Sequence, residues 1–142
     1  MNIGRCLCHK ASSRPLQPLY KLLEDIGPII TQNDCLETQL SVEIAILEIA
    51  SNIVCHSDSK SFDCIVDADS NGILITICDW TATTFQPETI YSQAEAMDRL
   101  KNLPQDQFNG RGLLLVSSVV DSIEFVDNFI TMFIRWREEG KS

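Results

Sequence analysis

The feature that most constrains this chain is the stretch from Leu36 to His56, LETQLSVEIAILEIASNIVCH. Its apolar residues cover most of a helical circumference and predict one long, buried helix. At roughly 100° per residue, one narrow line of that surface carries the polar side chains. On spacing alone, this line can simply face water, but the apolar residues on both its flanks favour a polar ligand opposite it. The line consists of Ser41, Ala45, Glu48, Asn52 and His56.

Composition limits the classes of protein to which the chain can belong. With 142 residues, 44% of them hydrophobic, it has the length of one domain (1–142) that buries a substantial core. The formal net charge of −9 argues against nucleic-acid binding, because phosphate contacts depend on clustered Lys and Arg. No run approaches the roughly 18 apolar residues of a membrane span. The first residues, MNIGRCLCHK, lack the features of a secretory signal. We therefore expect a cytoplasmic protein that binds neither nucleic acid nor membrane.

The cysteines form no C-x-x-C motif, and no histidine pair has the spacing of zinc ligands, which argues against a metal site. Cys6 and Cys8 share one face of a predicted strand, an arrangement that would allow a redox or ligand role. We favour the plainer interpretation, in which the cysteines are small buried hydrophobes in a reducing cytosol. The chain contains Cys6, Cys8, Cys35, Cys55, Cys64 and Cys78.

The remaining pattern predicts an alternation of strands and helices. Along the chain we expect a strand at 3–9 and then a helix that starts at Ser12, Ser13 and Pro15. Gly27-Pro28 should end or kink this helix, or Ile29-Ile30 continue it for a turn, before the long helix capped by Asn33 or Asp34. The later elements are strands at 62–69 and 72–79, helices at 88–100 and 113–120, and strands at 122–126 and 129–136. Turns at Asn71-Gly72 and Asp127-Asn128 make two hairpins. The predicted fold is an α+β two-layer sandwich, with helices on one face of a mixed, mostly antiparallel sheet.

Two further segments carry polar chemistry. Asp79 ends the apolar strand ILITICD, where a carboxylate either forms a turn or accepts a hydrogen bond from an exocyclic amine such as that of adenine. Gly110-Arg111-Gly112 directly precedes a predicted helix, and exposed backbone N–H groups at such a position suit a phosphate. The glycines could instead mark a tight entry into the helix. Arg111 is either the charge partner of a terminal phosphate or a solvated loop residue.

The order of these motifs carries a resemblance. E-x-x-x-N on a helix, an apolar strand ending in Asp and G-x-G opening a helix resemble the Bergerat-type ATP-binding fold of histidine kinases and gyrase. Within that superfamily, the chain is most similar to the anti-sigma-factor serine kinases of the RsbW type. The similarity is carried by LSVEIAILEIASNIVCH and NGRGLLLVSSVVDSIEF, and it spans nearly the whole chain.

The resemblance implies a function and a role for each motif residue. The chain would be an anti-sigma factor and protein-serine kinase that uses ATP and Mg²⁺. Its partners would be a sigma factor and an anti-anti-sigma protein, and it would form a homodimer. The implied roles are general base for Glu48, magnesium ligand for Asn52, adenine acceptor for Asp79, and nucleotide or phosphate contacts for His56, Gly110, Arg111 and Gly112.

The chain also departs from the family pattern. Thr81 and Thr83 stand where the family usually has glycines, and the segment expected to form the lid, Gln86 to Phe108, contains none. The Gly-Thr pair often found on a late strand is absent, and Thr131 is a candidate substitute for its adenine contact. These departures support an alternative: a catalytically weak or inactive nucleotide-binding module that acts only by binding its partner.

Overall fold

The computed structural model describes residues 1–56, 60–79, 89–104 and 111–137. The order of strands and helices agrees with the order predicted from the sequence. The elements are β1 (Asn2–His9), α1 (Gln17–Asn33), α2 (Leu36–His56), β2 (Ser61–Ala68), β3 (Gly72–Asp79), α3 (Gln93–Asn102), α4 (Arg111–Val119), β4 (Ser122–Val126) and β5 (Phe129–Arg135).

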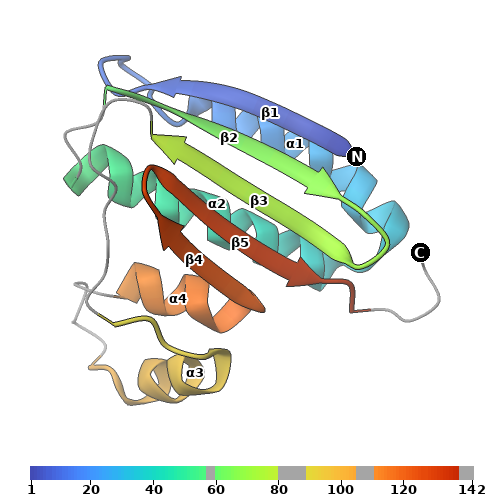
Figure 1. Ribbon diagram of the computed structural model, residues 1–142, viewed down its shortest axis with the longest axis vertical. Coiled ribbons are helices and arrows are strands. Elements are labelled where there is room, and N and C mark those ends of the chain that lie inside the picture. Colours follow the sequence, from blue (N-terminus) through green and yellow to red (C-terminus); the bar gives the residue numbers. More distant parts are fainter. Residues whose placement is uncertain (57–59, 80–88, 105–110, 138–142) are drawn as a thin grey trace.

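The five strands form one sheet in the order β1-β2-β3-β5-β4; α1, α2 and α4 lie on one of its faces, and α3 lies beside α4 (Figure 1). This arrangement confirms the two-layer α+β prediction. Every neighbouring pair among these strands is antiparallel, so the prediction of a mixed sheet is wrong. The reason lies in the long connection through α3 and α4. It brings β5 back to start beside the end of β3, with Phe129 opposite Cys78.

Side-chain alternation along the strands builds the core. One face of the central strands is almost fully apolar and packs against the helices, while none of the described helices covers the other face (Figure 1). Each large apolar side chain buried there contributes roughly 1.5–3 kcal/mol relative to an exposed one. The buried residues include Phe62, Cys64, Val66, Ile73, Ile75, Ile77, Ile130, Met132 and Ile134 from the sheet, and Val42, Ile46, Ile49 and Ile53 from α2.

Helix α2 is the central helix of this core. By length and composition alone, Leu36–Cys55 is apolar enough to cross a membrane. This differs from our prediction that no run approaches the length of a membrane span. In the folded chain, however, 44% of its most apolar window is buried. Val42, Ile46 and Ile49 are at most 1% exposed and belong to the cluster that also contains the sheet's inner face. The hydropathy of α2 is therefore accounted for by its place in the core.

Helix α1 begins later than its sequence signals predict. Its first residue is Gln17, and Leu16 takes the cap position without a side-chain hydrogen bond. Ser12, one of the predicted caps, accepts a hydrogen bond on Oγ from the backbone N of Arg14 at 3.2 Å. The hydroxyl therefore stabilises a local turn before the helix, which is a common alternative use of serine.

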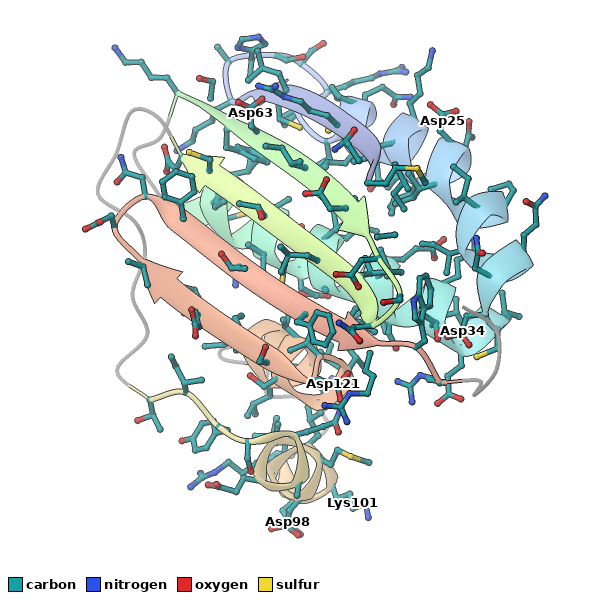
Figure 2. All side chains as sticks on the ribbon, turned by 45° about the vertical axis from the view of Figure 1, so that its right-hand side comes forward. Asp25, Asp34, Asp63, Asp98, Lys101 and Asp121 are labelled. Atoms are coloured by element: carbon teal, nitrogen blue, oxygen red, sulfur yellow. The ribbon has the colours of Figure 1, made fainter. Side chains whose placement is uncertain are left out.

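The end of α1 agrees with the alternative in which Ile29 and Ile30 continue the helix past Gly27-Pro28. The helix passes through Pro28 and reaches Asn33. Ile30, which follows the proline, is 1% exposed, so burial of the last turn against the core offsets the lost backbone hydrogen bond. Asp34, labelled in Figure 2, closes α1 and accepts a hydrogen bond from the Thr38 hydroxyl in the first turn of α2.

The two later helices are shifted from their predicted starts. Helix α3 begins at Gln93 rather than 88, because Ser92 Oγ accepts a hydrogen bond from the backbone N of Glu95 at 3.2 Å and donates to its carboxylate at 3.1 Å. This reciprocal arrangement is a helix N-cap that stops the helix from extending backwards. Helix α4 begins at Arg111 rather than Leu113, so Gly112 lies inside its first turn.

Candidate functional site

The segments that carry the predicted site residues lie toward the same end of the sheet. The C-terminal half of α2, the end of β3 and the start of α4 all lie on the left-hand side of Figure 1. These elements are distant in sequence and are brought together by the antiparallel order of the sheet and by the packing of α4 beside α2. The fold therefore places the motifs of α2 and α4 against each other, with the end of β3 on the same side of the molecule.

Within this region, Gly112 lies close to the polar line of α2. A Cβ atom placed on Gly112 would lie 2.7 Å from Glu48 Oε2 and 3.9 Å from Asn52 Oδ1. Any side chain at position 112 would therefore have to displace the Glu48 carboxylate. Glu48 and Asn52 are both half-buried. The alternative that their side of α2 simply faces open water is wrong, because the first turn of α4 lies against it.

Asp79 is the last residue of β3 and is 3% exposed. Since side chains alternate along a strand, its carboxylate lies on the same face as Ile75 and Ile77, the face covered by the helices. Its backbone N donates to the carbonyl of Asn128 at 2.9 Å, which fixes the end of β3 to the turn between β4 and β5. A buried carboxylate on this face can accept a hydrogen bond from an amine that enters between sheet and helices.

The remaining predicted site residues are described to different extents. Arg111 is the first residue of α4 and is half-buried. His56 is the last residue of α2, but its side chain lies outside the described part of the structure. Gly110, Thr81 and Thr83 also lie outside the described residues. Their predicted contacts with a nucleotide stay predictions.

Thr131 cannot make the adenine contact proposed for it. It pairs with Thr76 on β3 and Glu124 on β4, out of phase with the buried Ile130 and Met132. Alternation therefore places its side chain on the face of the sheet that carries no helix. The prediction for Thr131 is wrong, because only residues on the other face of β5, such as Ile130 and Met132, point toward α2.

Sequence reasoning missed the role of α3 as a support for α4. Gln93 Nε2 donates to the backbone carbonyl of Val120 at 3.2 Å, just after α4 ends. Ala96, one turn after Gln93, is fully buried, and α3 packs against α4. The sequence feature that could have predicted this contact is the spacing of Gln93 and Ala96, which places an amide and a small apolar side chain three residues apart on one face of the helix. The helix predicted inside the lid segment therefore supports the element that carries Gly112.

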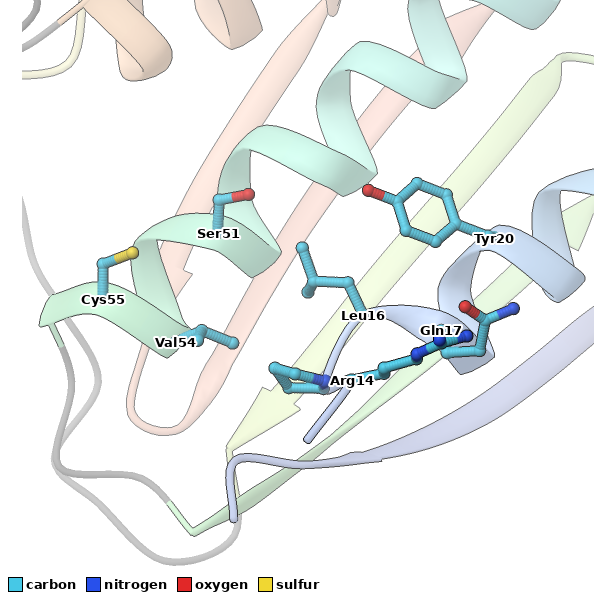
Figure 3. Close-up of a pocket in the computed structure, with 8 residues that line it drawn as sticks. Arg14, Leu16, Gln17, Tyr20, Ser51, Val54 and Cys55 are labelled. Atoms are coloured by element: carbon cyan, nitrogen blue, oxygen red, sulfur yellow. The ribbon is translucent and has the colours of Figure 1, made fainter. Parts of the chain in front are cut away.

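A cavity of about 290 Å³ lies elsewhere, between the start of α1 and the C-terminal part of α2. Figure 3 shows Leu16 and Tyr20 on one side of it and Ser51 and Cys55 on the other. Neither Glu48 nor Asn52 lines this cavity. It is therefore distinct from the region in which the predicted site residues meet.

The donor set near Gly112 is suited to magnesium held mainly by a ligand. In the described ranges, no three His, Cys, Asp or Glu side chains are grouped to hold a metal ion by themselves. Mg²⁺ usually takes only one or two protein groups and completes its shell with phosphate oxygens and water. The amide oxygen of Asn52, close to Gly112, is consistent with that kind of site.

Comparison with known proteins places the whole region in context. A family model for the histidine kinase-like ATPase domain matches residues 21–134. This range begins inside α1, ends in β5 and includes every residue that the sequence motifs single out. No curated protein matches the chain.

Proposed function

The chain belongs to the histidine kinase-like ATPase domain family, and we propose that it binds Mg-ATP where α2, β3 and α4 meet and transfers a phosphate to a serine of a protein partner. The observation that carries the proposal is the approach of Gly112 to Glu48, at 2.7 Å from a built Cβ. It puts the backbone of a helix start beside a carboxylate and an amide. Those are the groups that a phosphate, a metal ion and a hydroxyl require.

The described residues fit an adenine nucleotide with magnesium. Because Gly112 has no side chain, another group can come close to the N-terminal backbone of α4, as Glu48 Oε2 does, and the helix terminus attracts anions. Asn52 and Glu48 present oxygen atoms to the same point. Asp79 is a buried acceptor at the end of the sheet. When bound, Mg-ATP would supply the phosphoryl group and neutralise its charge.

In this proposal each side chain has a separate task. Glu48 would accept the proton of the serine hydroxyl, which a carboxylate within hydrogen-bond reach does efficiently, and ADP would leave as the phosphoryl group is transferred. Asn52 would hold the magnesium ion, and Asp79 would accept a hydrogen bond from the adenine amine. Arg111 and the backbone at Gly112 bind the phosphates, and Gly110 and His56 complete the nucleotide contacts. Positioning and charge stabilisation then account for most of the rate.

The proposed partners follow from the sequence resemblance and the charge. The chain would act in the cytoplasm as an anti-sigma factor, binding a sigma factor and phosphorylating an anti-anti-sigma protein, and would do so as a homodimer. A net charge of −9 suits a basic protein partner, because complementary charge accelerates association and excludes other acidic proteins. The same charge disfavours nucleic acid.

Nucleotide titration is the first test. Saturating Mg-ATP or Mg-ADP at about 100 times its dissociation constant would raise the free energy of unfolding by about 2.7 kcal/mol. For a domain of this size, that corresponds to a melting temperature higher by roughly 8 °C. Mg-GTP is the control nucleotide. Absence of any shift with millimolar Mg-ATP would contradict the proposal.

Phosphoryl transfer is the second test. The protein is incubated with γ-labelled ATP and purified anti-anti-sigma proteins, each paired with a variant in which the acceptor serine is replaced by alanine. Label on the wild-type acceptor alone would support the kinase. If nucleotide stabilises the protein but no acceptor is labelled, the chain is the partner-binding module that Thr81 and Thr83 favour, because side chains replace glycine in its first nucleotide motif.

A further inference from the structure

Three cysteines lie together on β1 and β2, away from the predicted nucleotide contacts. Cys6 of β1 is directly opposite Cys64 of β2 in the antiparallel register. Cys8 lies two residues further along β1 and therefore on the same face. Cys8 and Cys64 are fully buried, whereas Cys6 is partly exposed. The expectation of uniformly buried cysteines is thus wrong for Cys6 and Cys35, which are partly exposed, and for Cys55, which is exposed.

The three thiols differ in their readiness to ionise. A hydrogen bond from Cys8 lowers the pKa of Cys6, outweighing the opposing effects of burial and of Asp63. The same hydrogen bond, together with burial, raises the pKa of Cys8 well above that of a free thiol. Burial is also the largest cause of the raised pKa of Cys64. Cys6 is therefore the thiol with the most thiolate character, and it is also the one that solvent reaches.

The strand register decides which neighbour can bond to Cys6. Directly opposed residues in an antiparallel pair have Cα atoms about 4.5–5.5 Å apart, within the range of about 4.4–6.8 Å that disulfides span. Residues two apart on one strand are separated by about 6.6–6.8 Å, at the limit of that range. Cys64 is therefore better placed than Cys8 to form a disulfide with Cys6, although Cys8 is closer to Cys6 in sequence.

We propose that Cys6 is a peroxide-sensitive site and that its oxidation product is a cross-strand disulfide between Cys6 and Cys64, which joins β1 to β2. The Cys6 thiolate attacks one oxygen of hydrogen peroxide, the O–O bond breaks, and the departing hydroxide takes a proton and leaves as water. The Cys64 sulfur then attacks the Cys6 sulfenic acid, the S–O bond breaks, and the second hydroxide takes the Cys64 proton. Two thiols and one peroxide give one disulfide and two waters.

The disulfide would enclose α1 and α2, including Glu48 and Asn52, in one covalent loop. A cross-link over a loop of this length restricts the unfolded chain strongly and stabilises the fold. We expect the melting temperature to rise by about 10 °C on oxidation and to return when the protein is reduced. This inference does not depend on nucleotide binding.

The test is peptide mapping of the full-length chain after treatment with hydrogen peroxide and alkylation of the remaining thiols. It uses a Cys55→Ser background, which removes the exposed thiol that would link two molecules. We expect one major linked pair, Cys6 with Cys64, that disappears after reduction. Cys6→Ser and Cys64→Ala should abolish both the link and the thermal shift, whereas Cys8→Ala, the matched control from the same cluster, should keep the link but form it more slowly.

Three results would overturn the proposal. The first is a major Cys6–Cys8 link. The second is that, in the chain with Cys55 retained, peroxide oxidises the exposed Cys55 while Cys6 stays reduced. The third is a Cys6 that stops at the sulfenic acid and never bonds to Cys64. The map of the protein with Cys6, Cys8 and Cys64 intact decides between these outcomes, so the inference stays testable even if Cys64→Ala folds poorly.

Discussion

The two ends of the polar line on α2 are used in opposite ways. At the N-terminal end, Ser41 is 4% exposed and its hydroxyl accepts a hydrogen bond from the Arg137 guanidinium at 3.3 Å. The backbone N of Arg137 also donates to Asp34 Oδ2 at 3.0 Å. At the other end, Glu48 and Asn52 meet Gly112, a residue with no side chain. One end is closed by side chains of the chain itself, and the other meets bare backbone.

The difference shows why a polar stripe on a helix does not identify a site by itself. Ser41, Glu48 and Asn52 lie on one line of α2, and their spacing gives no reason to separate them. The element packed opposite each residue separates them. At Ser41, neighbouring side chains complete a hydrogen-bonded cluster, whereas at Gly112 the missing side chain lets the Glu48 carboxylate come close to the start of α4. We call the end of α2 at Ser41 the closed end and the end at Glu48 and Asn52 the glycine end.

The largest effect is expected for Glu48→Ala. If Glu48 takes the serine proton, its loss should lower the rate of phosphoryl transfer by 100-fold or more, the usual contribution of a general base. The affinity for Mg-ATP should change less than threefold, because the carboxylate acts on the acceptor rather than on the nucleotide. Label transfer and calorimetric titration measure the two quantities separately.

The control for Glu48 is Glu43→Ala on the same helix. Glu43 is half-buried and accepts a hydrogen bond from Gln39 Nε2 at 3.3 Å, so its removal is a comparable loss of carboxylate. It should leave transfer unchanged. Equal losses of transfer in both variants would mean that α2 is simply disturbed, and the assignment of Glu48 would have to be given up.

The next effect is expected at the closed end, for Asp34→Ala. Asp34 is 3% exposed, and its removal leaves the fully buried hydroxyl of Thr38 and the backbone N of Arg137 without this acceptor. We expect the free energy of unfolding to fall by about 2–3 kcal/mol, measured by urea denaturation. Asp25→Ala, an exposed residue on α1, should cost about 0.5 kcal/mol or less.

Nucleotide binding distinguishes the two ends in the same variant. Because Asp34 belongs to the closed end, Asp34→Ala should bind Mg-ATP within twofold of the wild type when both are measured well below their melting temperatures. A loss of affinity as large as the loss of stability would show that the two ends of α2 are coupled. The closed end would then not be separate from nucleotide binding.

A smaller effect is expected for Gly112→Ala. The new Cβ would lie 2.7 Å from Glu48 Oε2, so the carboxylate must move and the approach to the α4 backbone narrows. We expect affinity for Mg-ATP to fall by about tenfold, or about 1.4 kcal/mol. The intrinsic helix preference of alanine over glycine, about 0.5–1 kcal/mol, acts in the opposite direction on stability.

Gly27 provides a matched control for Gly112. It is also a helical glycine, and a Cβ built there would lie 2.7 Å from an amide nitrogen, Gln39 Nε2. The same steric demand is therefore made on a side chain that has no part in the proposed site. Gly27→Ala should leave nucleotide affinity unchanged. If both variants bind Mg-ATP as well as the wild type, the backbone at Gly112 does not contact the phosphates.

The sequence predicted the fold well wherever local signals decide the structure. Asp69 shows why: its carboxylate accepts from the backbone N of Asn71 at 2.7 Å and of Gly72 at 3.1 Å, which closes the turn between β2 and β3 within four residues. The hydrophobic period of α2 is equally local. Both features could be read without knowing the rest of the chain.

The parts that could not be predicted depend on contacts distant in sequence. The hydrogen bond from Arg137 to Asp34 joins residues 103 apart, and no local sequence pattern predicts it. Burial of Ile30 carries α1 past Pro28, against the local preference. The prediction for Thr131 did not consider which face of the strand the residue occupies, so its side chain was assigned to the wrong face of the sheet. In the site, motif order indicated which residues meet, but the Gly112–Glu48 approach required the structure.

The smallest effect is expected for Glu37→Ala, also at the closed end. Glu37 Oε1 lies 3.6 Å from Arg137 Nη1, but the two side chains are 72% and 36% exposed. Water screens such a pair, so its loss should lower the free energy of unfolding by about 0.5 kcal/mol or less, measured by urea denaturation at low salt. Asp34→Ala removes contacts to the same Arg137 segment and should cost several times more, because its partners are buried. Equal costs for the two variants would mean that charge rather than burial closes this end of α2.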